Sequence, residues 1–307
     1  MPGGQEAILL SRVALVDDSE PEFVSTTVLP GVGMQVLQTT VAVPDQNPRD
    51  LLVSVPLSDA ARMPPESISS GPFHLRVSNR SLQEKGAGED LIGTTPASDA
   101  QNQTLVDGGQ ATGTFTGTGS KAGVTATIEV TLSGRQIDLV ARATNKSEES
   151  RFVAFEWNPR FAAPDGDLNQ LGFSVPSQDT AGATGKQRSS GPGGQFLSAT
   201  VRPVGNQPFD FTFSHLDHEF LSDGTYLQLQ NGKRFLLRII GLGDALRSVR
   251  ARNDAATHSL LLNLSSLDTA PEAEQHDQTL RPGQTVQWHL RMEVLPVKPP
   301  LSTDSAH

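Results

Sequence analysis

Apolar and polar residues alternate along several stretches of the chain, with the period of two that is typical of half-buried β-strands. The clearest case is residues 123–132 and 136–144, two alternating runs that are separated by the turn Ser133-Gly134-Arg135. Two such runs around a short glycine turn predict a β-hairpin.

The C-terminal third shows the same pattern. Residues 225–230 and 234–240 predict a second hairpin around Asn231-Gly232, and residues 285–295 predict a closing strand after a Pro-Gly turn. Residues 152–157 predict one more strand, which ends at Asn158-Pro159. The pattern therefore favours antiparallel β-structure over most of the chain.

Residues 204–220 concentrate aromatic and ionisable side chains, although only 5% of the chain is aromatic. Three of the four phenylalanines in this stretch alternate with polar residues, which predicts a strand with one buried face. The phenylalanines are Phe209, Phe211, Phe213 and Phe220. The ionisable residues His215, Asp217, His218 and Glu219 follow this strand. They could bind hydroxyl groups and transfer protons, or form a solvated turn.

The N-terminal part predicts further strands and one long connection. Residues 7–15 and 21–27 predict edge strands, and residues 28–55 predict a bend and a hairpin. Residues 83–123 are rich in Gly, Thr, Ser and Asp and predict a long crossing loop or flap. Residues 180–194 are of low complexity and predict a flexible segment. No fixed repeat or clear linker divides the chain. We therefore predict one β-domain at residues 28–298, with N-terminal edge strands at 1–27 and a disordered tail at 299–307.

Composition narrows the classes of partner and location. The 307 residues carry a formal net charge of -10 at pH 7, and an acidic surface does not attract the phosphate backbone of nucleic acids. We therefore expect no nucleic-acid partner. No apolar run is long enough to cross a bilayer, so we expect no membrane partner either. The abundance of Ser, Thr, Gly, Asn and Gln favours a periplasmic or secreted location, with any signal peptide already removed.

Several kinds of chemistry have no signal in the sequence. The chain has no cysteine, which excludes disulfides, thiolate catalysis and cysteine-bound zinc. It also has no phosphate-binding glycine loop, no His-Glu-x-x-His motif and no Gly-x-Ser-x-Gly elbow. His215 and His218 are three residues apart, a spacing that holds a metal poorly in a strand or turn. We expect no metal and no cofactor.

A set of short motifs occurs in one order between residues 28 and 294. Arg76-x-x-Asn79-Arg80 is followed by Pro208-Phe209-Asp210, by Asp217-His218-x-Phe220 and by Leu280-Arg-Pro-Gly283. This order resembles the aldose 1-epimerase (galactose mutarotase) family, whose Gly-Arg-x-x-Asn-Arg motif differs here in having Leu75 in place of the glycine. The resemblance implies an all-β, single-domain antiparallel β-supersandwich with a cleft for a monosaccharide.

The resemblance also implies which residues bind the sugar. Arg76 and Asp217 match the sugar-binding Arg and Asp of the family, and a guanidinium and a carboxylate suit the hydroxyls of a hexose. Asn79, Asp107 and Trp157 are further candidates, and the indole would either stack on a sugar ring or pack in the core. The expected partner is a monosaccharide or a glycan.

The family's catalytic residues are not matched. Its members take a proton from the anomeric hydroxyl with a Glu while a His protonates the ring oxygen. Asp107 replaces the His of the family's Leu-His-Gly-Gly segment, and Ser266 falls nearest to the position of the base Glu. The family's Asn-His-x-Tyr-Phe segment reads Phe155-Glu156-Trp157-Asn158-Pro159-Arg160-Phe161 in this chain.

Three functions follow. The substitutions favour the first, a carbohydrate-binding protein with a degenerate ring-opening site. The second is an active aldose 1-epimerase with substitute groups, His218 or Glu156 as the acid and Asp107 or Asp268 as the base. The third is a structural or adhesive β-protein without a sugar cleft, in which Arg76 and Asp217 would lie far apart.

Overall fold

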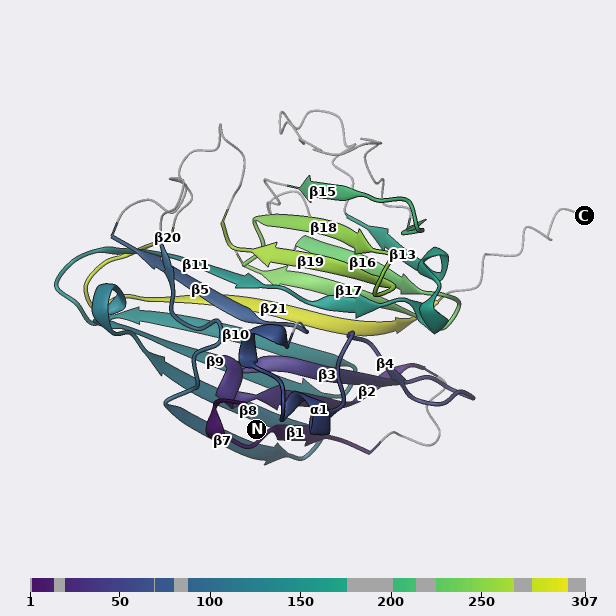
Figure 1. Cartoon of the computed structure of the whole chain (residues 1–307), viewed down its shortest axis with the longest axis horizontal. Coiled ribbons are helices and arrows are strands. Elements are labelled where there is room, and N and C mark those ends of the chain that lie inside the picture. Colours follow the sequence, from purple (N-terminus) through teal and green to yellow (C-terminus); the bar gives the residue numbers. More distant parts are fainter. Residues whose placement is uncertain are drawn as a thin grey trace, which may run out of the picture.

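The computed structural model describes residues 2–13, 20–68, 70–79, 88–175, 201–213, 225–243, 245–267 and 278–297. Strands dominate these residues, and their only α-helix is the four-residue α1 (Leu57–Ala60) (Figure 1). No helix in the described ranges is both long and apolar enough to span a membrane. The predicted all-β class is confirmed.

The largest sheet has the order β14-β13-β16-β17-β21-β10-β9-β8-β7 within the described residues. Its strands are β7 (Asp99–Leu105), β8 (Gly108–Thr116), β9 (Val124–Ser133), β10 (Gln136–Asn145), β13 (Leu171–Ser174), β14 (Arg202–Pro203), β16 (Thr225–Asn231), β17 (Phe235–Leu242) and β21 (Thr285–Pro296). All neighbouring pairs are antiparallel. The hairpins predicted at residues 123–144 and 225–240 are confirmed as β9–β10 and β16–β17, and the predicted closing strand is β21, between β10 and β17.

A second sheet has the order β15-β18-β19-β11-β5-β6, with two short strands paired to it. Its strands are β5 (Phe73–Ser78), β6 (Glu89–Asp90), β11 (Arg151–Trp157), β15 (Asp210–Phe213), β18 (Ser248–Asp254) and β19 (Ser259–Ser265). The short strand β12 (Arg160–Ala162) pairs with β19, and β20 (Gln278–Leu280) pairs with β11.

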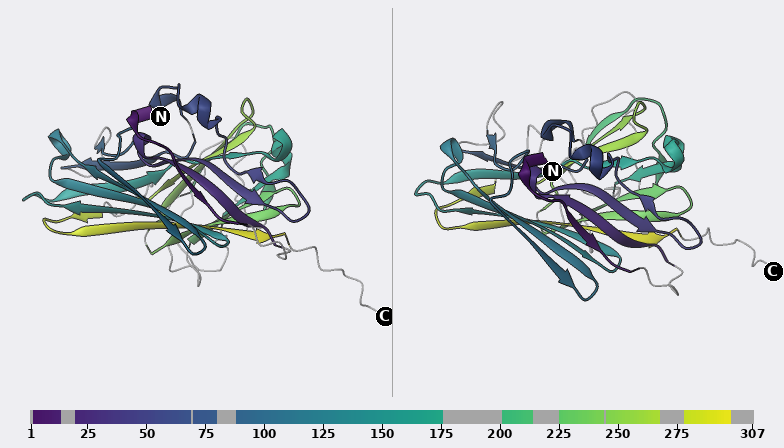
Figure 2. Two further views of the ribbon diagram at one scale, coloured as in Figure 1. Left: turned by 90° about the horizontal axis from the view of Figure 1, so that it is seen from below. Right: turned by 60° about the horizontal axis from the view of Figure 1, so that its bottom comes forward.

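An N-terminal sheet contains β1 (Ile8–Ser11), β2 (Glu22–Leu29), β3 (Gln35–Ala42) and β4 (Arg49–Asp50). Single turns of 3-10 helix complete the described elements: η1 (Pro2–Gly4), η2 (Pro30–Val32), η3 (Pro65–Ser67), η4 (Gly119–Lys121), η5 (Pro164–Gly166) and η6 (Leu168–Gln170). The N-terminal sheet lies across β8–β10 of the large sheet (Figure 2). A β-bridge between Leu52 and Phe161 joins the segment after β4 to β12.

All three sheets contribute to one hydrophobic core. Val41 of β3, Trp157 of β11 and Leu290 of β21 belong to the same cluster of buried residues. The domain boundary expected after residue 27 falls inside β2 (Glu22–Leu29), which continues through it. The N-terminal strands are therefore part of the sandwich rather than an appendage.

The expectation of a long loop or flap at residues 83–123 was wrong for the described part of this stretch. It contains β6, β7 and β8, and β7–β8 is a hairpin at the edge of the large sheet. Few large apolar side chains are present because the N-terminal sheet packs closely on β8. A Cβ atom on Gly113 would lie 2.5 Å from Cγ and Sδ of Met34. Gly113 thus fits the close approach of Met34, and β7 is exposed over nearly its whole length; composition alone does not distinguish either situation from a loop.

Candidate functional site

The outer face of the second sheet carries polar side chains on neighbouring strands. In β5, Phe73, Leu75 and Val77 are buried in the core. Strand alternation therefore places His74 and Arg76 on the opposite face, where both are half-buried. In β11, Glu156 lies directly opposite His74 in the antiparallel register. Two adjacent strands thus bring a cation, an imidazole and a carboxylate together.

Arg76 and Glu156 form the centre of this group. Arg76 Nη1 lies 3.8 Å from Glu156 Oε1, and the two side chains are 33% and 18% exposed. Asn263 of β19 donates from Nδ2 to Glu156 Oε2 at 3.2 Å and to Asn158 Oδ1 at 2.6 Å. A continuous set of hydrogen-bonding groups therefore runs from β5 through β11 to β19. We call Arg76, Glu156, Asn158 and Asn263 the polar network.

His74 is held at one end of the polar network by Asp90 of β6. The distance from His74 Nδ1 to Asp90 Oδ2 is 2.5 Å, and Asp90 Oδ1 accepts the backbone N–H groups of Leu75 and Ile92, each at 3.1 Å. Burial disfavours the charged imidazole, but the hydrogen bond to Asp90 and the negative charges of Asp90 and Glu156 outweigh it and raise the pKa of His74. His74 therefore keeps its proton to a higher pH than an ordinary histidine does.

A hollow of about 600 Å³ opens at the other end of the polar network, over β18 and β19. It shares Asn158 and Asn263 with the network, and Arg160, Arg250, Arg252 and Glu66 also line it. A second hollow of about 250 Å³ shares Arg160 and Arg252 with the first. The first hollow has the size that is usual for small-molecule sites, and its lining combines these polar groups with the apolar residues Ile68, Pro72, Leu261 and Leu262.

The structure brings some of the predicted residues together and separates others. Arg76 and Glu156 are adjacent, and Asn79 is exposed just beyond the end of β5. Asp107 lies on the large sheet, in the β7–β8 turn, where its Oδ1 accepts a hydrogen bond from Arg12 Nε at 2.6 Å. It lines a different hollow, with Arg135 and Glu293. The expected grouping of Asp107 with Arg76 is therefore wrong.

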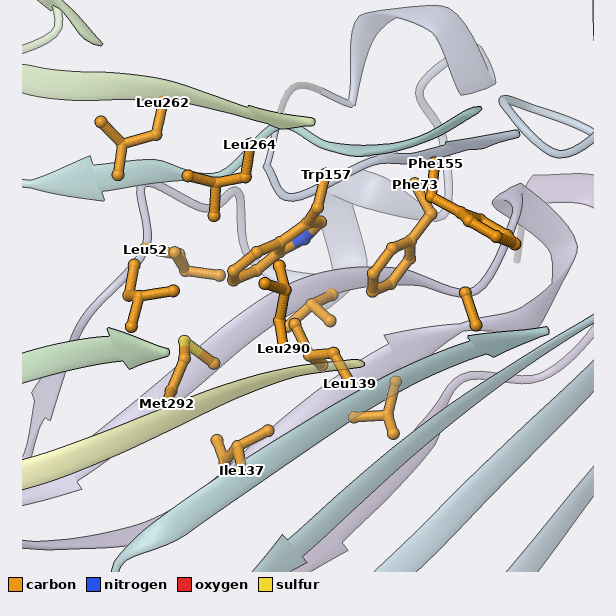
Figure 3. Packing of buried hydrophobic residues seen from close by; sticks show 14 of the residues in the cluster. Leu52, Phe73, Ile137, Leu139, Phe155, Trp157, Leu262, Leu264, Leu290 and Met292 are labelled. Atoms are coloured by element: carbon orange, nitrogen blue, oxygen red, sulfur yellow. The ribbon is translucent and has the colours of Figure 1, made fainter. Parts of the chain in front are cut away.

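Trp157 packs in the core rather than facing a ligand. Its side chain is fully buried and stacks on Phe73, with ring centroids 6.0 Å apart and an angle of 19° between the planes (Figure 3). Its Nε1 donates to the carbonyl oxygen of Gly71 at 3.0 Å. Of the two roles considered for this indole, a stacking face for a sugar is ruled out because no face of the ring is open.

Three predicted site residues, Asp217, His218 and Asp268, lie outside the described residues. His74, which the sequence analysis did not single out, occupies the position next to Glu156. The sequence did contain a signal for it, because in the alternating stretch Phe-His-Leu-Arg-Val-Ser a residue two positions before Arg76 must share the face of Arg76. Asn158 and Asn263 had no comparable signal, since their contact depends on the pairing of β11 with β19.

The arrangement of sheets is that of galactose mutarotase-like proteins. No protein-family model matches the chain, and no curated protein sequence matches it. Solved structures do match over nearly their whole length. One is a provisionally assigned aldose 1-epimerase from Escherichia coli K12, with a TM-score of 0.60 and 11% sequence identity over 94% of this chain and 99% of that one.

Two further solved structures are similar to this chain. The Slr1438 protein from Synechocystis sp. PCC 6803 has a TM-score of 0.64 and 14% identity, over 96% of this chain and 98% of that one. A galactose mutarotase-like protein from Clostridium acetobutylicum has a TM-score of 0.60 and 10% identity, over 93% and 97%. At these identities the similarity confirms the predicted resemblance and the β-sandwich fold.

Proposed function

We propose that the protein binds a monosaccharide, or a terminal sugar of a glycan, on the outer face of the second sheet at the polar network. The observation that carries this proposal is that the ion pair of Arg76 with Glu156 and the hydrogen bonds of Asn263 to Glu156 and Asn158 form one polar network, which continues into a hollow of about 600 Å³. Similar structures named as aldose 1-epimerase or galactose mutarotase-like proteins support a sugar as the ligand.

The chemistry of the network suits vicinal hydroxyl groups. A guanidinium donates several hydrogen bonds, a carboxylate only accepts them, and a primary amide does both, so that each hydroxyl of a sugar can find a complementary partner. Arg76 and Glu156 are far enough apart, at 3.8 Å, for ligand oxygens to replace part of their mutual contact. The partial exposure of both side chains leaves them accessible to a ligand.

Arg76→Ala tests the proposal, with Arg142→Ala as its matched control. Arg142 is an arginine of similar exposure, 39%, on the large sheet, where it pairs with Glu129. Affinity for a panel of hexoses, measured by saturation-transfer NMR and calorimetry, should fall at least tenfold in Arg76→Ala and stay unchanged in Arg142→Ala. Circular dichroism and urea unfolding should show that both variants are folded. Equal affinity of Arg76→Ala and the parent protein would refute the proposed site.

An active aldose 1-epimerase is a second candidate function, and the position of His74 beside Glu156 favours it. In this scheme Glu156 accepts the proton of the anomeric hydroxyl while protonated His74 gives a proton to the ring oxygen, and the C1–O5 bond breaks to leave the open aldehyde. Reversal after rotation about the C1–C2 bond gives the other anomer and restores both groups. The raised pKa of His74 keeps a proton available for this step.

Polarimetry distinguishes the two candidates. The protein should speed the equilibration of freshly dissolved α-glucose or α-galactose if it is an epimerase, and Glu156→Gln should abolish this effect. An unchanged rate at high protein concentration, together with measurable sugar binding, would leave only the binding function.

A further inference from the structure

Three arginines line the hollow beside the polar network. Arg250 and Arg252 are two positions apart on β18, so that both side chains lie on the outer face, and both are exposed. Arg250 is directly opposite Asn263 of the polar network in the β18–β19 register. Arg160 of β12 completes the set. A sugar that binds to Glu156 and Asn263 would therefore have these arginines beside it, on the side that faces the hollow.

The three arginines differ in how far carboxylates of the protein already engage them. Arg160 is fixed, since its Nη1 donates to Asp254 at 3.1 Å and to Thr257 at 3.0 Å, and its side chain is 17% exposed. The Arg252 side chain makes no hydrogen bond and no ion pair with any residue in the described ranges, although the carboxylate of Asp210, directly opposite it in the β15–β18 register, interacts with it electrostatically. Of the three guanidinium groups, that of Arg252 therefore has the most N–H donors available to a ligand.

Arg250 is engaged but can exchange its partner. It donates from Nε and Nη2 to Asp210 at 2.7 and 2.5 Å, and the two side chains are 54% and 35% exposed. This ion pair is bidentate but open to solvent, so a ligand anion reaches Arg250 by displacing the Asp210 carboxylate from it. Glu66 of η3 also lines the hollow, and in the part of the chain that the structure describes it forms no ion pair with these three arginines.

We propose that this arginine cluster binds an acidic substituent of the sugar, a carboxylate or a phosphate monoester, while the polar network holds the sugar hydroxyls. Planar guanidinium groups recognise both kinds of anion through paired hydrogen bonds. A chain with a net charge of -10 repels anions in general, so that an anionic sugar needs such a local cluster in order to bind. This inference rests on the proposed sugar-binding function and adds the charge of the ligand.

The test compares three forms of one sugar with the full chain. Calorimetry at low salt would measure glucose, glucuronate and glucose 6-phosphate, then the galactose series, with inorganic phosphate as a probe of the anion alone. At least one acidic sugar should bind tenfold or more tightly than its neutral form, a difference of about 1.4 kcal/mol. The better of the uronate and the phosphate identifies the substituent.

Arg252→Gln should remove this preference and leave the affinity for the neutral sugar unchanged, whereas Arg142→Gln, which removes the same charge from the large sheet, should preserve it. Equal binding of neutral and acidic sugars, or a preference that survives Arg252→Gln, would overturn the inference while leaving the sugar site intact. Inorganic phosphate that binds as tightly as the sugar phosphate would also overturn it. Acidic sugars that bind equally well to Arg76→Ala would instead refute the proposed function and leave the arginine cluster standing.

Discussion

Replacing Trp157 with phenylalanine tests whether this residue serves the fold or the site. Trp157 is fully buried, stacks on Phe73 and donates a hydrogen bond to Gly71. If these contacts define its role, Trp157→Phe should destabilise the protein and leave sugar affinity unchanged in the folded molecules. If instead the indole contacted a sugar, the substitution would act mainly on affinity, because exposed positions change stability by only about 0.5 kcal/mol.

The expected loss of stability can be worked out from these contacts. Phenylalanine lacks two ring carbons of the indole, which is worth about 1.6 kcal/mol at about 0.8 kcal/mol per buried carbon. The lost N–H leaves the buried Gly71 carbonyl with only the longer bond from the Val36 amide, at 3.4 Å. A poorly satisfied buried group costs about 1–2 kcal/mol. The free energy of unfolding should therefore fall by about 3 kcal/mol, a large part of the 5–15 kcal/mol that is usual for a domain.

Urea unfolding measures this loss, with circular dichroism and the fluorescence of Trp288, the one tryptophan that remains, as separate probes. Val106→Ala is the control, since Val106 is fully exposed in the β7–β8 turn and its truncation should change the free energy of unfolding by less than about 0.5 kcal/mol. A Trp157→Phe protein with parental stability and weakened sugar binding would show that the indole reaches the ligand, contrary to its position here.

Two further predictions concern the surroundings of the site. Asp90→Asn keeps an oxygen for the backbone N–H groups but removes the charge that raises the pKa of His74. An NMR titration should show that this pKa falls. The pair stabilises the fold fully below the ordinary histidine pKa of about 6.5 and less as pH rises through the raised value, so the variant should lose more stability at pH 5 than at pH 8, and an equal loss would contradict the pairing. In urea unfolding, Gly33→Ala should lower the free energy of unfolding more than Gly119→Ala does. Both glycines have φ of 60°, but of the two only Gly33 would bring a Cβ against a backbone oxygen, that of Gly93 at 2.2 Å. Equal losses of free energy would show that this contact relaxes freely.

Hydrophobic periodicity predicted the strands whose two faces differ most. β9 and β10 alternate strictly between buried and partly exposed residues over most of their length, and Gly134 in their turn has a positive φ, so that pattern and turn agree. The order of the short motifs also predicted which β-fold the chain adopts, although its sequence identity to the similar structures is only 10–14%. The β7–β8 hairpin was not predicted, because β7 is an exposed edge strand and the glycines of β8 lie close to neighbouring residues. Neither strand therefore shows a clear alternation of large apolar and polar residues.

The alternation of side chains in a strand would also have corrected one part of the predicted site, the placing of Glu156 and Trp157 in the same cleft. Glu156 and Trp157 are neighbours in one strand, and successive side chains of a strand point to opposite faces. Both could not line one cleft, and the buried Phe155 shares the face of Trp157. Glu156 therefore had to be the outward residue. The pairing of β11 with β5 and β19, which decides that Glu156 meets Arg76 and Asn263, depends on contacts distant in sequence and had no local signal.

The position of the proposed site follows from the way in which the two faces of the second sheet are used. Its inner face supplies the core through residues such as Leu75 and Trp157, which leaves the residues of the other parity free to carry function without weakening the sandwich. His74, Arg76 and Glu156 have this parity on β5 and β11, and Asn263 and Arg250 have it on β19 and β18. Substitutions of this parity should therefore act on ligand affinity, and those of the other parity on stability. Trp157 and Arg76 test this division most directly. The sequence predicted both residues for one sugar cleft, whereas in the structure they lie on opposite faces of the second sheet.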